Sequence, residues 1–319
     1  MGDEFCNSCG GHPGYCSCSR SGSWHARLGS NDEQPSDFDR NRMWLENLRN
    51  LNLSNSKLCF ANLSEKQFDD SDLSGSDLNC ANLRKSSLCR SNLSGVNLRG
   101  ANLSDANLYL TNLEGADLQG ANLSGAYLSQ TNLGHTNLAG ANFDGAVLRE
   151  ANLVGAEISG VTMRKTQLSG MDFRYVNLSG AIMPESRVSG DLSGCFLSGA
   201  FLVKAELTDL NLSGAYLQGA QLASANFARS KLIGAYLTGS FAKNAFFGWA
   251  DLSNAYLVGT NLEGSYLSGA NLSDAYLSGA NFTRANLSGA DLTGADLTGA
   301  ILAGANTTGT TMPDGSVAT

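Results

Sequence analysis

Residues 285–304 read ANLSGADLTGADLTGAILAG, four near-copies of one five-residue unit. The same pattern extends over residues 51–304, with Leu or Phe at the centre of nearly every unit. A small residue, usually Ala, Ser or Thr, stands two positions before the centre, and Asn or Asp stands one before it. Gly commonly follows two positions after the centre. The fold therefore depends on which backbone conformation repeats with a period of five.

A period of five fits neither regular secondary structure. On an α-helix, a step of five residues advances the side chain about 140° beyond a full turn, so the leucines would spread around the surface. On a continuous strand, an odd period would send successive leucines to opposite faces. A chain that turns a corner once per unit can instead point every central residue inward. Four such sides close a square coil.

The residues at the corners favour this interpretation. A type II turn needs a positive φ at its third position, which Gly adopts without strain. Gly is commonest at the position that would be third. The second position suits Pro, and both Pro184 and Pro313 fall there. Coils stacked at the ~4.8 Å spacing of β-strands would bury the leucines in internal columns and align the outward Asn residues in ladders.

The A-[ND]-L-x-x pattern over residues 51–304 resembles the pentapeptide-repeat family. The resemblance implies that family's right-handed quadrilateral β-helix, so we expect an all-β solenoid over residues 51–306. The four-cornered coil follows from the residues, whereas its handedness follows from the resemblance. Some members of the family protect DNA gyrase by imitating duplex DNA. A DNA-mimicking inhibitor or protector of a topoisomerase is therefore one alternative function.

The repeat loses one residue between Val188 and Leu192, where SRVSG is followed by DLSG. This register break near 189–192 predicts a local kink or a tightened corner, and a simply tolerated deletion is the other interpretation. At the C-terminal end, residues 307–319 depart from the repeat and predict a short cap or tail.

The N-terminal 50 residues differ from the repeat. Residues 1–34 are rich in Cys, Gly and Ser and predict a flexible tail. Residues 35–50 predict a short helix, with Ser36 or Asp37 as its cap and with Trp44, Leu45 and Leu48 as an apolar stripe. We expect this helix to cover the open end of the first coil, because terminal repeats need a cap.

Composition narrows the class of function. The net charge is −8, whereas a protein that binds nucleic acid directly is expected to carry a basic stripe, so we expect no direct nucleic-acid partner. No apolar run approaches the ~20 residues that span a bilayer, and the N-terminus has no secretory signal pattern, so we expect a cytoplasmic protein without membrane contact. With three His residues and no evident nucleophile–base or carboxylate pair, an enzyme is not expected.

Four cysteines near the N-terminus form a C-x2-C-x6-C-x-C cluster. They are Cys6, Cys9, Cys16 and Cys18. Four thiolates this close in sequence can surround one zinc ion, which would make the tail a metal-dependent regulator. The spacing matches no recognised zinc finger, so reduced or redox-paired thiols are the alternative.

Aromatic residues replace Asn or Asp on one outer face of the C-terminal half. Five of them recur at every twentieth position, and three more lie on other sides of the same coils: Phe196, Tyr216, Tyr236, Tyr256 and Tyr276, then Phe246, Trp249 and Tyr266. One interpretation is structural, because aromatics suit β surfaces and stabilise neighbouring strands. The other is a docking strip for a protein, because Tyr and Phe are enriched at interface centres.

These observations predict a non-catalytic scaffold whose flat faces bind a protein partner of unknown identity, with these aromatic residues of the C-terminal half as the predicted docking surface. Packing of coil ends or faces could also produce a homo-oligomer. Residues 250–319 carry several acids and one base, Arg284. Duplex DNA carries one charge per ~1.7 Å of axis, and the acids here are far sparser, which favours the scaffold over the DNA mimic.

Overall fold

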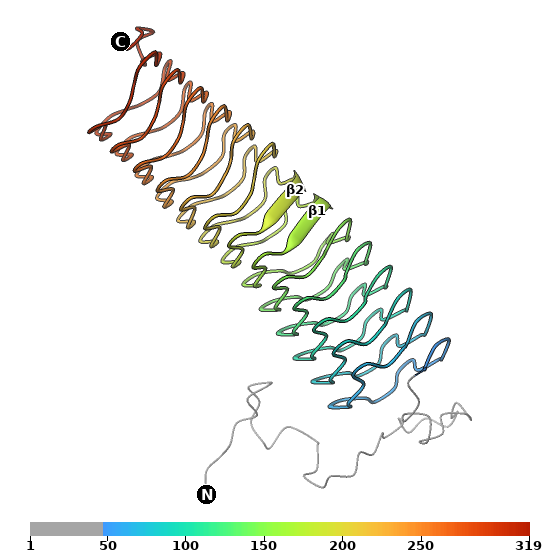
Figure 1. Ribbon diagram of the computed structural model, residues 1–319. Coiled ribbons are helices and arrows are strands. Elements are labelled where there is room, and N and C mark those ends of the chain that lie inside the picture. Colours follow the sequence, from blue (N-terminus) through green and yellow to red (C-terminus); the bar gives the residue numbers. More distant parts are fainter. Residues whose placement is uncertain (1–46) are drawn as a thin grey trace, which may run out of the picture. The chain divides into compact units, whose positions relative to one another are not determined.

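The computed structural model describes residues 47–319. They form two compact units. The first comprises residues 47–147 together with Ala151–Glu157. The second contains Leu148–Glu150 and Ile158–Thr319. Each unit is a stack of coils in which the chain turns a corner once in every five residues (Figure 1).

Parallel β-bridges join each coil to the next. In the first unit Asn82 bridges Asn102, and in the second unit Tyr236 bridges Tyr256. The backbone hydrogen bonds repeat in step, because Leu83 N–H donates to Asn102 C=O at 2.7 Å and Asn102 N–H donates to Ala81 C=O at 2.9 Å. The partners are one complete coil apart, which confirms the four-sided β-solenoid.

The corners have the expected turn geometry. At a representative corner, Ala121 N–H donates to Leu118 C=O at 2.9 Å, and Gly120 has a φ of 66°. Only Gly adopts that φ without a steric cost. Non-glycine residues also occupy this corner position, for example Asp105 with a φ of 59°. The third corner position thus has a positive φ whichever residue fills it, which confirms the prediction and explains why Gly is commonest there.

The central residues fill the interior of each coil. Leu128, Phe143 and Leu257 are completely buried, and burial of one such side chain contributes about 1.5–3 kcal/mol. Phe227 and Phe247 stack inside the second unit with ring centroids 5.1 Å apart. Many buried Ser and Thr hydroxyls find backbone acceptors, as when Thr131 Oγ1 donates to the carbonyl of Leu108 at 2.6 Å, whereas the buried hydroxyls of Ser129 and Ser240 have no partner.

The missing residue produces the two regular strands of the described chain. β1 (Gln167–Asp172) pairs in parallel with β2 (Arg187–Asp191), and the register shifts between Leu168 and Met171 (Figure 1). β2 therefore passes straight through the place of a corner, and the extra residue of β1 is absorbed as a bulge. Gly190 has a φ of 130° and lies against the backbone of Met171.

Both ends of the repeat extend beyond the sequence-based boundaries. At the N-terminal end, Asn47 bridges Gln67 and Leu48 is buried, so residues 47–50 form a repeat corner and not the end of a helix. The other residues assigned to that cap helix, and the tail before it, lie outside the described residues.

At the C-terminal end the coil continues to Thr311, which bridges Asp291. The chain then folds back, and Thr311 pairs with Val317 in antiparallel orientation. A hydrogen bond from Met312 N–H to Ser316 C=O closes this hairpin at 2.7 Å. The part of the chain described here contains no helix that is both long and apolar enough to span a bilayer.

Candidate functional site

The structure brings the five predicted aromatic residues of the C-terminal half into one stack, here called the aromatic column. Its members are Phe196, Tyr216, Tyr236, Tyr256 and Tyr276. Successive ring centroids are 4.9, 4.9, 4.8 and 4.6 Å apart, and neighbouring ring planes differ by 9° or less. Consecutive β-bridges hold the backbones at that spacing, so the rings repeat with the coil.

Stacking hides most of the flat ring surface of the column. The end rings of Phe196 and Tyr276 are 39 % and 45 % exposed, whereas the three rings between them are half-buried. Each stacked pair contributes about 0.5–1.5 kcal/mol beyond the area that it buries. The column therefore stabilises the coils and offers a partner mainly ring edges and hydroxyls.

The corners that flank the aromatic column are largely uncharged. In the described second unit, the corner residues on both sides of the column are Ser, Gly, Gln, Thr, Ile, Val or Asn up to Gly259, and Asp274 is the first charged one. A partner therefore cannot recognise this face mainly through charges of one sign. Whatever contacts it must rely on apolar and neutral polar groups.

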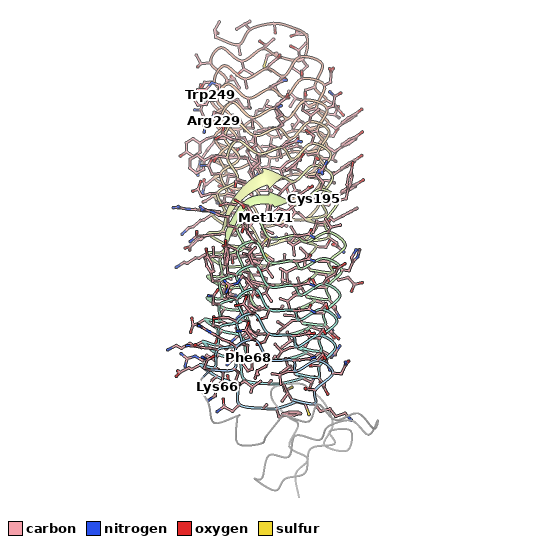
Figure 2. All side chains as sticks on the ribbon, turned by 90° about the vertical axis from the view of Figure 1, so that its right-hand side faces the viewer. Lys66, Phe68, Met171, Cys195, Arg229 and Trp249 are labelled. Atoms are coloured by element: carbon pink, nitrogen blue, oxygen red, sulfur yellow. The ribbon has the colours of Figure 1, made fainter. Side chains whose placement is uncertain are left out.

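A second cluster, here called the Trp249 patch, consists of Phe246, Trp249 and Tyr266. Phe246 and Tyr266 stack with centroids 4.8 Å apart and are 41 % and 48 % exposed. Their side of the coil follows two sides after the aromatic column, so the two clusters lie on opposite faces. The Trp249 side chain is 70 % exposed at the next corner (Figure 2).

Trp249 occupies a corner position that Gly usually fills. Its φ is 55°, a conformation that is uncommon and strained for a bulky residue. The indole lies over the next coil, because a Cβ on Gly269 would be 2.7 Å from Trp249 Nε1. On the preceding coil, Arg229 turns away toward Asp209, whose carboxylate accepts two hydrogen bonds of 2.7 and 2.6 Å.

The same geometry occurs at Tyr175, which the sequence-based site did not include. Tyr175 has a φ of 59°, is 76 % exposed, and lies over Gly194, where a Cβ would be 2.6 Å from its ring. The sequence does carry a signal for such residues. It is a large side chain at the Gly position of a corner with a Gly at the same position one coil later.

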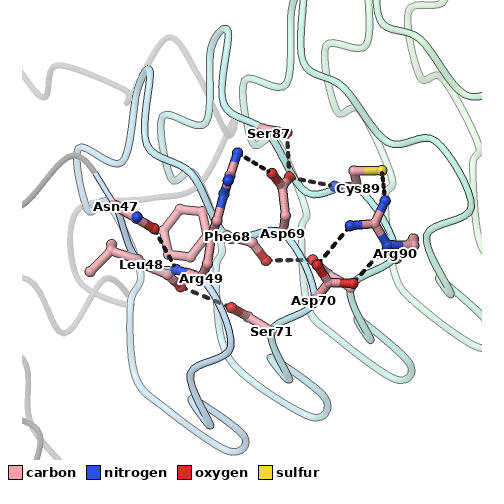
Figure 3. Close-up of polar contacts among 11 residues, drawn as sticks. Asn47, Leu48, Arg49, Phe68, Asp69, Asp70, Ser71, Ser87, Cys89 and Arg90 are labelled. Atoms are coloured by element: carbon pink, nitrogen blue, oxygen red, sulfur yellow. Dashed lines mark hydrogen bonds and ion pairs between the residues drawn. The ribbon is translucent and has the colours of Figure 1, made fainter.

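A polar network joins three successive coils near the N-terminal end of the described chain (Figure 3). Asp69, which is buried, accepts hydrogen bonds from Ser87 and from the Cys89 N–H and pairs with Arg49 at 2.9 Å. Arg90 holds Asp70 through two bonds of 2.7 Å, which lower the pKa of that carboxyl. Burial raises the pKa of the Cys89 thiol, so this cysteine is not an activated nucleophile.

The predicted metal ligands Cys6, Cys9, Cys16 and Cys18 lie outside the described residues. Within residues 47–319, no three His, Cys, Asp or Glu side chains come together as a metal site. The zinc site and its regulatory role stay predictions from the sequence.

The acidic C-terminal coils should respond to pH through Asp296. Hydrogen bonds from Ser278 and Thr298 lower the pKa of Asp296 from 3.8 to about 2. A lowered pKa in the folded state contributes stability above about pH 4, and that contribution is lost as the pH falls toward about 2. We expect the thermal midpoint of Asp296→Asn to vary less than that of the wild type over this range. If thermal scans show the same change of midpoint with pH in the variant and in the wild type, this assignment is contradicted.

Comparison with known proteins identifies relatives of this repeat. A family model described as pentapeptide repeats matches the chain in successive segments that together cover residues 52–312. The matched segments are residues 52–89, 67–105, 91–130, 126–164, 159–190, 191–222, 205–241, 230–269, 245–284 and 280–312. A search of curated proteins finds no match.

Among solved structures, the chain is similar to HetL, a pentapeptide repeat protein involved in heterocyst differentiation regulation in the cyanobacterium Nostoc sp. strain PCC 7120. The two are 31 % identical over 85 % of this chain and 91 % of HetL, with a TM-score of 0.21. QnrB1, a plasmid-mediated fluoroquinolone resistance protein, is 18 % identical over 66 % of this chain and 88 % of its own, with a TM-score of 0.27. A pentapeptide repeat protein from the Arabidopsis thaliana thylakoid lumen is 29 % identical over 36 % of this chain and 66 % of its own, with a TM-score of 0.22.

Proposed function

Because the chain belongs to the pentapeptide-repeat family, whose members fold as right-handed β-helices, we propose that it is a non-catalytic scaffold that binds a protein partner. The docking site is the Trp249 patch of the second unit. The observation that carries the proposal is a Trp side chain, 70 % exposed, at a corner where Gly would be less strained. The aromatic column on the opposite face acts mainly as a stabilising ladder.

Trp249 is costly for the fold and well suited to an interface. A non-glycine residue at a φ of 55° costs roughly 1 kcal/mol relative to Gly. Its exposed indole recovers little of that cost by burial, because most of the side chain faces solvent. Trp and Tyr, together with Arg, are enriched among the residues that dominate binding energy at protein interfaces. Trp249, with the stacked Phe246 and Tyr266 beside it, supplies such an anchor.

Basic side chains on the corners beside the patch are neutralised in ion pairs, as Lys243 is by Glu263 at 3.1 Å. Arg229, the nearest base on the same corner column, is already paired with Asp209. Charged residues are depleted at the centres of interfaces and aromatic residues are enriched there. The proposed partner therefore presents an apolar pocket or groove to the indole.

We expect Trp249→Gly to weaken partner binding strongly without harming the fold. Affinity purification from the source cell, with mass spectrometry, should show a partner captured by the wild type and reduced on the order of tenfold or more with the variant. The thermal midpoint should stay the same or rise, because Gly relieves the strained φ.

Tyr175→Gly is the matched control, since Tyr175 has the same corner geometry over Gly194 but lies outside the patch. This variant should keep the partner. Equal capture by Trp249→Gly and the wild type, or equal loss with both variants, would contradict the proposal. A gyrase supercoiling assay distinguishes the scaffold from the DNA-mimicking topoisomerase inhibitor. A scaffold predicts no inhibition, whereas a DNA mimic predicts inhibition.

A further inference from the structure

We propose that the aromatic column is a site of oxidative modification, at which a one-electron oxidant joins tyrosines of adjacent coils as dityrosine. Four of its five rings are phenols, in unbroken succession from Tyr216 to Tyr276. The column lies on the face opposite the Trp249 patch, so coupling of its tyrosines does not depend on that patch.

The spacing of the rings favours coupling between neighbours. Tyr236 and Tyr256 have centroids 4.8 Å apart and planes that differ by 6°. Such rings are related almost by a translation, so equivalent ortho carbons are separated by about the same distance. β-Bridges fix both backbones, so the two side chains stay together and meet at a high effective concentration. Coupling then requires the two side chains to rotate until two ortho carbons meet, while the bridged backbones stay in place.

The chemistry balances with two equivalents of oxidant. Each of two neighbouring tyrosines gives one electron to the oxidant and its phenolic proton to water, which leaves two phenoxyl radicals. The radicals form one carbon–carbon bond between ortho positions, and the two ring hydrogens then return to the oxygens through solvent. The half-buried rings leave part of each side chain in contact with water for these proton transfers.

Other tyrosines of the described chain lack this arrangement. Tyr266 stacks on Phe246, which cannot form a phenoxyl radical. Tyr109 and Tyr127 lie with centroids 6.0 Å apart and planes tilted by 39°. Within the column, Phe196 stacks on Tyr216 and cannot couple. The coupling partners are therefore confined to Tyr216, Tyr236, Tyr256 and Tyr276. A bond between two of these closes a loop of one coil and should stabilise the second unit by restricting its unfolded state.

Two variants with equal tyrosine content test the proposal. The Tyr236→Phe/Tyr276→Phe double variant keeps every stacked ring but has no neighbouring tyrosines within the aromatic column. The Tyr216→Phe/Tyr276→Phe double variant keeps one neighbouring pair, Tyr236 and Tyr256. Dilute purified chains are treated with photogenerated ruthenium(III) tris-bipyridyl, a one-electron oxidant, and dityrosine is measured by fluorescence.

Peptide mapping locates the bond. Trypsin separates Tyr236, in peptide 232–243, from Tyr256, in peptide 244–284. We expect the wild type to yield monomeric chains in which neighbouring column peptides are joined, including 232–243 with 205–229 or 244–284. The variant with one pair should give about half of the wild-type yield, since it can form one bond where the full column can form two. The variant without pairs should give several-fold less than the variant with one.

Three results of the oxidation experiment, apart from the site of the bond, would overturn the proposal. They are equal yields from the two variants, cross-links that join separate chains, and a wild type that gives no dityrosine under conditions that couple free tyrosine. A mapped bond to Tyr266 in place of Tyr256 would overturn it as well.

Discussion

The Leu257→Asp variant should fail to fold its second unit under conditions where the wild type is stable. Leu257 is completely buried, and so are Leu237 and Leu277, the central residues of the coils on either side. An Asp at this site would place a carboxylate among aliphatic side chains with no partner. Leaving a charge buried and unpaired costs roughly 3–5 kcal/mol or more, a large share of the net stability of a domain.

Val258 provides the control for this prediction. It is the next residue, it is also apolar, and it is 40 % exposed at the corner. Val258→Asp should change the free energy of unfolding by no more than about 0.5–1 kcal/mol, as surface substitutions do. Chemical denaturation followed by circular dichroism measures both variants. A Leu257→Asp chain as stable as Val258→Asp would contradict the inward assignment of the central residues.

The Gly190→Ala variant should be the most damaging change of a glycine in the second unit. A Cβ at this position would lie 2.0 Å from the carbonyl oxygen of Met171, and its φ of 130° is one that L-residues rarely adopt. The obstacle is backbone held by the β1–β2 pairing, so it cannot turn aside like a flexible side chain. We expect a loss of about 3 kcal/mol or more.

Gly199→Ala separates the clash from the cost of a positive φ. Gly199 has a φ of 65°, and a Cβ there would meet nothing within 4 Å. The expected loss is only about 1 kcal/mol, which is the cost of the left-handed conformation alone. The difference between the two denaturation midpoints therefore measures the contact with Met171. Equal midpoints would show that the bulge at the register break relaxes freely.

The sequence was sufficient to predict the coil because its signal is local and repeated. Each unit carries its own central Leu and its own corner Gly, and the arithmetic of five residues excludes a helix and a straight strand. The aromatic column was predictable for the same reason. Phe196 and Tyr216 recur at the coil period, so their stacking followed from the period alone.

The register break could not be predicted in detail. Gly190 looks like any other corner Gly in the sequence, yet it lies in a strand and faces the backbone of Met171. Its role depends on how the shortened segment pairs with the coil before it, which is a property of two segments and not of one. The extension of the coil to Thr311 was missed because Thr replaces the usual pattern near that end.

The candidate site was likewise predictable only in part from the sequence. The sequence placed Trp249 near Phe246 and Tyr266 but not its position over Gly269, because corner side chains can turn toward either neighbouring coil. Arg229 turns back toward Asp209, whereas Trp249 lies forward. How much surface each aromatic exposes also depends on stacking. That is why the column and the Trp249 patch, alike in composition, are assigned different roles.

The most direct test of the coil itself is a distance between two corners of the second unit. Ser193 and Ser273 occupy the same corner of coils that are joined in succession through Ser213, Ile233 and Ser253. Spin labels at these two positions, in a chain without other accessible cysteines, report their separation by pulsed electron paramagnetic resonance. Four coils at ~4.8 Å predict about 19 Å plus the length of the label tethers. A sharp distance near that value is the expected result, and a separation beyond roughly 40 Å would contradict the four-sided coil.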